Sequence, residues 1–118
     1  MSSLFDRIGA ELRRGLLQIA ALSLLQKRLY GYQLVKILAS HGLDTEEGTL
    51  YPLLRRLETQ GLLRSEWDTE GTRPRKYYVL TAEGQKALPQ CESAWREVAG
   101  AVSSILEQGV LQPQEGKE

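Results

Sequence analysis

The chain has 118 residues, of which 42% are hydrophobic and 25% are charged, and its net charge is +0. This composition excludes an intrinsically disordered or fibrous protein, and the length suits one domain with a modest core. The charge is unevenly spread, since residues 1–80 carry 12 Lys and Arg against 9 Asp and Glu, whereas residues 81–118 carry 3 against 6. The first of these segments is basic enough to attract nucleic acid locally, despite the neutral total.

Several other classes of protein have little support. The single Cys91 cannot form an internal disulfide, and residues 1–15 lack the apolar core of a signal peptide, so we expect a cytoplasmic protein. The longest apolar run, residues 16–25, is about half the length of a membrane-spanning helix. One histidine and one cysteine cannot supply the three or four ligands of a zinc site, so we expect no metal and no cofactor. Without a glycine-rich phosphate loop or paired acids, we do not expect an enzyme.

Two helices are predicted in the first part of the chain. Residues 1–11 are expected to form a loose or short helical lead-in, and residues 12–27 a helix that is apolar on most sides and therefore buried. Two arginines near the start of this helix are interpreted as solvated charges, Arg13 and Arg14. The pattern breaks at Gly31, and a second helix is expected to follow and to run through Ser40, with these residues facing the core: Tyr32, Val35, and Leu38 or Ala39.

Residues 48–61 predict a third helix, starting near Glu46, with two different faces. Its core face carries leucines at i, i+3, i+4 and i+7, namely Leu50, Leu53, Leu54 and Leu57. The other face carries groups that can bond phosphates or base edges in a major groove, namely Thr49, Tyr51, Pro52, Arg55, Arg56 and Thr59. Asp44 or Thr45 can cap the helix, and Pro52 is expected to make its first turn irregular. Taken alone, the segment fits an ordinary amphipathic helix with solvated arginines better than a DNA reader.

A β-hairpin is predicted next, and its presence beside the third helix favours DNA binding over an ordinary amphipathic helix. Residues 62–67 and 75–80 have the two-residue period of strands. The segment between them, residues 68–74, contains Gly and Pro and no large apolar side chain, which is typical of a turn. Three basic residues cluster at the tip or just inside the second strand, Arg73, Arg75 and Lys76. Three helices followed by a basic hairpin predict a winged helix-turn-helix domain over residues 1–81.

Thr81 can cap a last helix over residues 82–108. Its apolar residues are separated by 3, 4, 3, 4 and 3 positions and form a heptad seam, namely Leu88, Cys91, Trp95, Val98, Val102 and Ile105. At 1.5 Å per residue the helix is roughly 40 Å long, so we expect it to project from the winged domain and pair with a second copy. Pro89 is expected either to kink this helix or to begin another, and the residues after Gln108 to fray. Residues 82–118 are therefore assigned to dimerisation and a tail.

Trp95 on this seam is a candidate effector site. Small neighbours, among them Cys91 and Ala99, are expected to leave a gap beside the indole ring. A planar aromatic compound that stacks in the gap is one interpretation, and simple packing of a large apolar residue is an alternative with at least equal support.

Five runs in this order and spacing closely resemble the PadR family of bacterial transcriptional regulators: YGYQLVKIL (30–38), GTLYPLLRRLETQGLL (48–63), SEW (65–67), RKYYVLT (75–81) and EGQKAL (83–88). The resemblance spans roughly residues 12–107. It implies a mainly α-helical fold with a small β-hairpin, in a dimeric winged helix-turn-helix repressor whose long C-terminal helix forms the dimer. It also supports the effector interpretation, because some short members of the family bind drugs with a matching tryptophan.

The predicted partner is double-stranded DNA with a palindromic operator that matches the two-fold symmetry of a dimer. Four residues of the third helix are expected to read or anchor to the major groove, Thr49, Tyr51, Arg55 and Arg56. Five others are expected to hold phosphates, Tyr32 and Lys36 on the second helix and Arg73, Arg75 and Lys76 on the hairpin. The alternative is a winged-helix module that binds protein, although a protein-binding face favours exposed aromatics and leucines over arginine and lysine.

Overall fold

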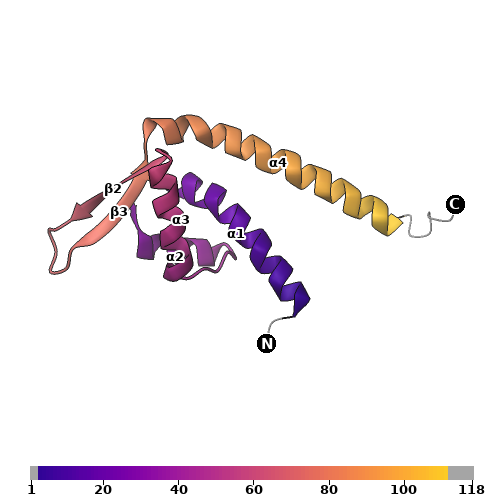
Figure 1. Ribbon diagram of the computed structural model, residues 1–118, viewed down its shortest axis with the longest axis horizontal. Coiled ribbons are helices and arrows are strands. Elements are labelled where there is room, and N and C mark those ends of the chain that lie inside the picture. Colours follow the sequence, from indigo (N-terminus) through magenta and orange to yellow (C-terminus); the bar gives the residue numbers. More distant parts are fainter. Residues whose placement is uncertain (1–2, 112–118) are drawn as a thin grey trace.

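The computed structural model describes residues 3–111, which form four helices and a three-stranded sheet (Figure 1). In chain order the elements are α1 (Leu4–Leu24), β1 (Leu29–Tyr30), α2 (Gly31–Ser40), α3 (Glu47–Thr59), β2 (Leu63–Asp68), β3 (Arg75–Leu80) and α4 (Ala82–Leu111). Figure 1 shows α1, α2 and α3 gathered beside the sheet, whereas most of α4 extends away from them. The predicted fold, a winged helix-turn-helix domain with a long C-terminal helix, is confirmed.

The core of the winged domain is built almost entirely from leucine. All four predicted leucines of α3 are buried, each at most 6% exposed. They pack with residues of the other elements, namely Leu17, Ala21 and Leu22 of α1, Leu25 at the C-terminal cap of α1, Leu34 and Leu38 of α2, and Leu63, Tyr78 and Leu80 of the sheet. Full burial of such a side chain contributes about 1.5–3 kcal/mol relative to exposure, so this cluster stabilises the domain.

The first helix begins earlier than predicted. α1 runs without a break from Leu4, so a separate lead-in over residues 1–11 is wrong for its described part. The cause is a capping box: the backbone N–H of Asp6 donates to Oγ of Ser3 at 3.0 Å, and the carboxylate of Asp6 accepts from the N–H of Ser3 at 3.4 Å. α1 also ends at Leu24 rather than at residue 27.

The predicted core face of α2 is partly wrong. Leu34 and Leu38 are its buried side chains, whereas Tyr32 is 50% exposed. Gly31, Leu34 and Leu38 are spaced by three and four residues and therefore share the buried stripe. This arrangement releases Tyr32 to the surface near the predicted DNA-binding face.

The predicted hairpin of β2 and β3 is confirmed, and a short third strand joins it. The sheet order is β1-β3-β2, with antiparallel pairing throughout. Leu63 lies opposite Leu80 at the base of the hairpin, and Asp68 lies opposite Arg75 at its tip. The central strand β3 is also tied to the helices, because the N–H of Leu80 donates to the carbonyl of Leu25 at 2.9 Å. The hairpin is the wing, and residues 69–74 form its tip.

The start of α3 differs from the prediction in its cap. Glu46 is the N-cap residue and makes no side-chain capping bond, so neither Asp44 nor Thr45 has the expected role. Oγ1 of Thr45 is buried, and it has no hydrogen-bond partner among residues 3–111. α3 continues through Pro52 as one helix.

The last helix is longer than predicted and continues past Pro89 to Leu111. Thr81 caps it as expected, since its Oγ1 accepts from the N–H of Gly84 at 3.0 Å and donates to the carbonyl of Gly61 at 2.6 Å. Leu88 and Cys91 pack against the core of their own winged domain. The later seam residues are exposed, namely Trp95, Val98, Val102 and Ile105. A long helix with an uncovered apolar stripe thus leaves the domain.

Candidate nucleic-acid interface

The exposed face of α3 is centred on residues opposite its buried leucines. With 3.6 residues per turn, Pro52 and Arg55 lie near that centre, Tyr51 lies toward one flank, and Thr49 and Arg56 lie toward the other. Arg55 and Arg56 are both exposed, and no described carboxylate lies within 4.0 Å of either guanidinium. These two charges are free to meet an anionic partner.

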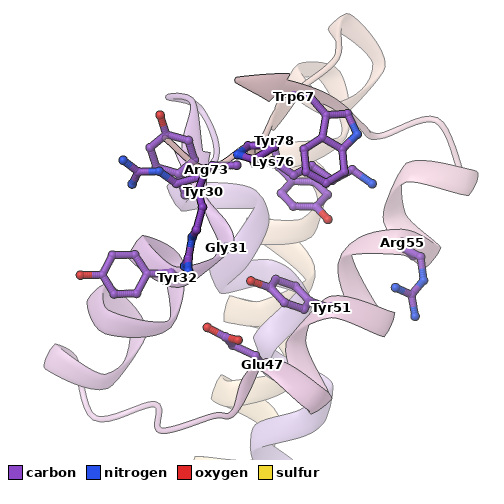
Figure 2. A pocket seen from close by; sticks show the side chains of 12 residues that line it. Tyr30, Gly31, Tyr32, Glu47, Tyr51, Arg55, Trp67, Arg73, Lys76 and Tyr78 are labelled. Atoms are coloured by element: carbon purple, nitrogen blue, oxygen red, sulfur yellow. The ribbon is translucent and has the colours of Figure 1, made fainter. Parts of the chain in front are cut away.

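A hollow of about 460 Å³ separates α2 and α3 from the wing (Figure 2). Figure 2 shows Tyr51 and Glu47 of α3 facing Tyr32 of α2 across the hollow, with Trp67 and Lys76 of the wing nearby. The full lining is Tyr30, Gly31, Tyr32, Glu47, Tyr51, Arg55, Trp67, Arg73, Pro74, Arg75, Lys76 and Tyr78. The hollow therefore joins aromatic rings and cations from α2, α3 and the wing in one surface.

Two cations of the wing, Arg75 and Lys76, lie over aromatic rings. The guanidinium carbon of Arg75 lies 4.4 Å from the ring centre of Tyr30. Nζ of Lys76 lies 5.7 Å from the ring of Trp67 and 5.8 Å from that of Tyr78. Cation–π contacts of this length are worth about 0.5–1 kcal/mol at exposed sites, enough to orient the side chains while leaving their charge unneutralised.

Two of the tyrosine rings that line the hollow, Tyr30 and Tyr51, are held by polar contacts or by burial. The hydroxyl of Tyr30 donates to Oδ2 of Asp68 at 2.6 Å, so the end of β1, just before α2, is linked to the end of β2, just before the wing tip. This hydrogen bond is the main cause that lowers the pKa of Asp68 and raises the pKa of Tyr30. Burial, and then the neighbouring Glu47 carboxylate, raises the pKa of Tyr51, so its hydroxyl remains a donor.

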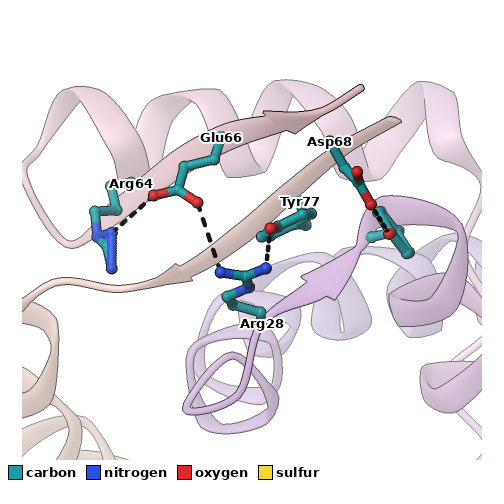
Figure 3. A network of polar contacts seen from close by, with 6 residues as sticks. Arg28, Arg64, Glu66, Asp68 and Tyr77 are labelled. Carbon is teal, nitrogen blue, oxygen red and sulfur yellow. Dashed lines mark hydrogen bonds and ion pairs between the residues drawn. The ribbon is translucent and has the colours of Figure 1, made fainter. Parts of the chain in front are cut away.

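A second polar network lies along the sheet, and it neutralises its own arginines (Figure 3). Glu66 pairs with Arg28 at 3.7 Å and with Arg64 at 3.5 Å. The guanidinium of Arg28 also donates to the hydroxyl of Tyr77. Exposed pairs of this kind contribute about 0–1 kcal/mol, but they make Arg28 and Arg64 weaker candidates for DNA contact than the unpaired cations of the wing, Arg73, Arg75 and Lys76.

The structure brings six of the nine predicted DNA-binding residues around the hollow: Tyr32, Tyr51, Arg55, Arg73, Arg75 and Lys76. The other three do not line it. Thr49 lies on the flank of α3 that faces α1, and Arg56 points toward the same flank. Lys36 is exposed on α2, where its Nζ lies 5.1 Å from the ring centre of Tyr32.

Sequence reasoning missed several lining residues, mainly Tyr30, Glu47, Trp67 and Tyr78. The tyrosine-rich run at residues 30–32 was a usable signal for Tyr30, because it precedes a helix in a basic domain. The sequence signal for Trp67 was weaker. A large ring near the tip of a hairpin is expected to be exposed unless another segment covers it, and Trp67 is 62% exposed.

None of the helices between residues 3 and 111 combines the length and apolar character needed to cross a bilayer. In the same part of the chain, no three His, Cys, Asp or Glu side chains are grouped so that they could hold a metal ion.

Comparisons with known proteins agree with this geometry. A family model described as the transcriptional regulator PadR-like family matches residues 21–90. Transcriptional regulator Rv3488 of Mycobacterium tuberculosis is 40% identical over 74 residues, which are 63% of this chain and 69% of that protein. A PadR family transcriptional regulator from Eggerthella lenta has a similar crystal structure, with a TM-score of 0.82 and 50% identity, over 88% of this chain and 93% of that chain. A PadR-like transcription factor from Bacteroides fragilis matches with a TM-score of 0.67 and 39% identity, over 85% of this chain and 99% of that chain.

Proposed function

Because the chain belongs to the PadR-like family of transcriptional regulators, which bind DNA, we propose that it is a homodimeric repressor that binds a palindromic operator and is released by a small-molecule effector. The observation that carries the proposal is the set of unpaired cations on the face shared by α3 and the wing. The family is not enzymatic, in agreement with the sequence.

The charge distribution supports DNA binding by this face. Arg55 on α3 and three wing cations, Arg73, Arg75 and Lys76, line one hollow, where the single carboxylate is that of Glu47. Phosphate contacts from such residues supply most of the affinity for any duplex, and contacts from the exposed face of α3 to base edges supply the sequence preference.

The exposed stripe of α4 supports the dimer. Val98 is 60% exposed and Ile105 is 68% exposed, although both belong to a helix that reaches beyond its own domain (Figure 1). A stripe of this kind at heptad spacing is stabilised by pairing with the same stripe of a second copy. Two-fold pairing presents two recognition helices, and this is why we propose a palindromic operator.

Release by an effector is proposed from Trp95. The residue is 41% exposed, and its neighbours Cys91 and Ala99 are small and half-buried. In the proposed dimer, two such rings approach the two-fold axis from opposite sides. A planar aromatic compound that stacks between them would change the separation of the two α4 helices, and with it the spacing of the recognition helices.

The proposal is tested by titrating the protein against a mixed-sequence duplex at two salt concentrations. We expect the affinity to fall steeply as salt rises, because bound phosphates release counterions. Selection from a random duplex pool should then return a palindrome, whose spacing reports the dimer geometry. The competing hypothesis, a winged-helix module that binds protein without DNA, expects no salt-dependent duplex binding.

A further inference from the structure

A second hollow, of about 350 Å³, lies between α1 and the beginning of α3. Its lining is Ala10, Arg13, Arg14, Leu17, Asp44, Thr45, Glu46 and Thr49. Thr49 belongs to the recognition helix, whereas the arginines belong to α1, so the hollow adjoins the flank of α3 that lies away from the wing.

Arg13 and Arg14 are exposed on α1, a helix that is anchored in the core. Leu17 and Ala21 hold the same helix in the core. No described carboxylate lies within 4.0 Å of Arg13 or Arg14, although Asp44 and Glu46 line the same hollow. The charges of Arg13 and Arg14 are therefore not neutralised by ion pairs within the described part of the chain.

The geometry of a major groove gives these arginines a role. The groove is about 12 Å wide, and a helix with its side chains is about 10–12 Å across, so the phosphates of both DNA strands lie close to an inserted helix, one strand along each flank. The wing and Tyr51 occupy one flank of α3. The other flank presents Thr49 beside the α1 arginines.

We propose that Arg13 and Arg14 of α1, together with Thr49 of α3, bind the phosphate backbone of the DNA strand opposite to the strand held by the wing. This inference rests on the proposed insertion of α3 into a major groove. The guanidinium groups supply charge, and the Thr49 hydroxyl donates a hydrogen bond to a phosphate oxygen. The recognition helix is thereby held from both flanks, which fixes its depth and its register along the groove.

The test compares the full chain with an Arg13→Gln, Arg14→Gln double variant. The probe is a fluorescein-labelled mixed-sequence duplex, and anisotropy titrations between about 50 and 200 mM salt give the slope of log affinity against log salt. Each lost phosphate contact lowers this slope by about 0.9, so the double variant should lose about 1.8 for each bound protomer. An Arg13→Lys, Arg14→Lys variant keeps the charge and should keep most of the slope.

The matched control is a Lys86→Gln, Arg96→Gln variant, which removes the same charge from the exposed surface of α4. Its slope should equal that of the unaltered protein. The inference is overturned if the α1 double variant keeps the full slope, or if the α4 control loses as much. If the unaltered protein shows no salt-dependent duplex binding, the proposed function fails, and the inference fails with it. If the unaltered protein does bind and the α1 double variant keeps the full slope, the inference alone fails.

Discussion

The ring of Tyr51 in α3 lies directly on the backbone of Gly31 at the start of α2. A methyl group added at Gly31 would lie 2.7 Å from Oη of Tyr51 and 2.9 Å from its Cζ, closer than real Cβ atoms approach other heavy atoms. Gly31 is buried, and the same tyrosine ring lines the hollow of the candidate interface. This contact therefore sets both the packing of two helices and the position of a side chain in the candidate interface.

We expect Gly31→Ala to destabilise the protein by about 1–3 kcal/mol, because overpacking displaces the Tyr51 ring or shifts α2. Urea unfolding measures the change in the free energy of unfolding. Gly15→Ala in α1 is the control: nothing lies within 4 Å of its added methyl group, and helix propensity alone should stabilise it by up to about 1 kcal/mol.

A double-mutant cycle identifies the cause of the loss. In a Tyr51→Ala background the ring is gone, so Gly31→Ala should cost little. An undiminished cost in that background would show that some other contact of Gly31 is responsible.

The sequence predicted those features that depend on local pattern. The spacing of Leu50 and Leu57 with their neighbours defined the buried face of α3, and Thr81 was recognised as a helix cap from its position alone. The alternating segments before and after residues 68–74 likewise predicted the wing. In each case the periodicity or the cap lies within a few adjacent residues, so no knowledge of distant contacts was needed.

Features that depend on distant pairing were not predictable in this way. The two-residue strand β1 exists because Leu29 lies opposite Tyr78, and nothing within residues 29–30 indicates such a partner. The exposure of Tyr32 follows from the contact of its neighbour Gly31 with Tyr51, twenty positions along the chain. The early start of α1 is different, since the capping box of Ser3 and Asp6 is a local signal that sequence reasoning overlooked.

The hydrogen bond from Tyr30 to Asp68 should position the wing over a defined pH range. The lowered pKa of Asp68 means that its contribution to stability is present above the ordinary carboxyl value of 3.8 and is lost as pH falls through the folded pKa. The raised pKa of Tyr30 means that its contribution is present below 10.0 and is lost as pH rises through the folded value. We therefore expect the bond to be intact across the neutral range.

Tyr30→Phe removes this bond and should shift the pKa of Asp68 upward, toward its ordinary value, as followed by carboxyl NMR chemical shifts. The N–H of Glu70 still donates to Asp68, so part of the depression should remain. Tyr32→Phe is the matched control, because no contact of its hydroxyl with Asp68 occurs in the described structure. An unchanged Asp68 pKa in Tyr30→Phe would contradict the assigned cause.

Neutralising the wing should weaken binding to all duplexes alike. Arg75→Ala or Lys76→Ala removes one proposed phosphate contact, so the salt slope should fall by about 0.9 for each bound protomer. Arg64→Ala is a suitable control, since Arg64 already pairs with Glu66 on the sheet. If neither wing variant changes affinity or slope, the wing does not bind phosphate.

Arg55 is expected to differ from the wing cations, because it lies near the centre of the exposed face of α3. If the guanidinium binds a guanine, replacement by Ala should reduce the free energy of discrimination between bases at one operator position by about 1–3 kcal/mol. Selection from a random duplex pool with the variant and the unaltered protein measures this. A uniform loss of affinity with unchanged preference would make Arg55 a phosphate contact instead.

Dimerisation through α4 predicts that charge on its apolar stripe separates the protomers. A Val102→Glu, Ile105→Glu variant should sediment as a monomer at micromolar concentration, because like charges would be buried against each other in the paired helices. Ser104→Glu lies on the opposite side of α4 and should leave the association state unchanged. A monomeric unaltered protein would contradict the proposed dimer outright.

The effector proposal predicts that Trp95 senses added planar compounds. The chain has two tryptophans, so Trp67→Phe leaves Trp95 as the single indole reporter. Planar aromatic cations such as ethidium should quench its emission in a saturable way if they stack on the ring, whereas an indole packed only against protein should not respond.

The matched control is Trp95→Phe, which retains Trp67 and should show no saturable quenching. A planar aromatic compound that, unlike ethidium, does not intercalate into DNA should also release a bound duplex from the unaltered protein but not from Trp95→Phe, because such a ligand acts only by changing the spacing of the recognition helices. Absence of saturable quenching in the Trp67→Phe protein would make Trp95 a packing residue of the dimer seam.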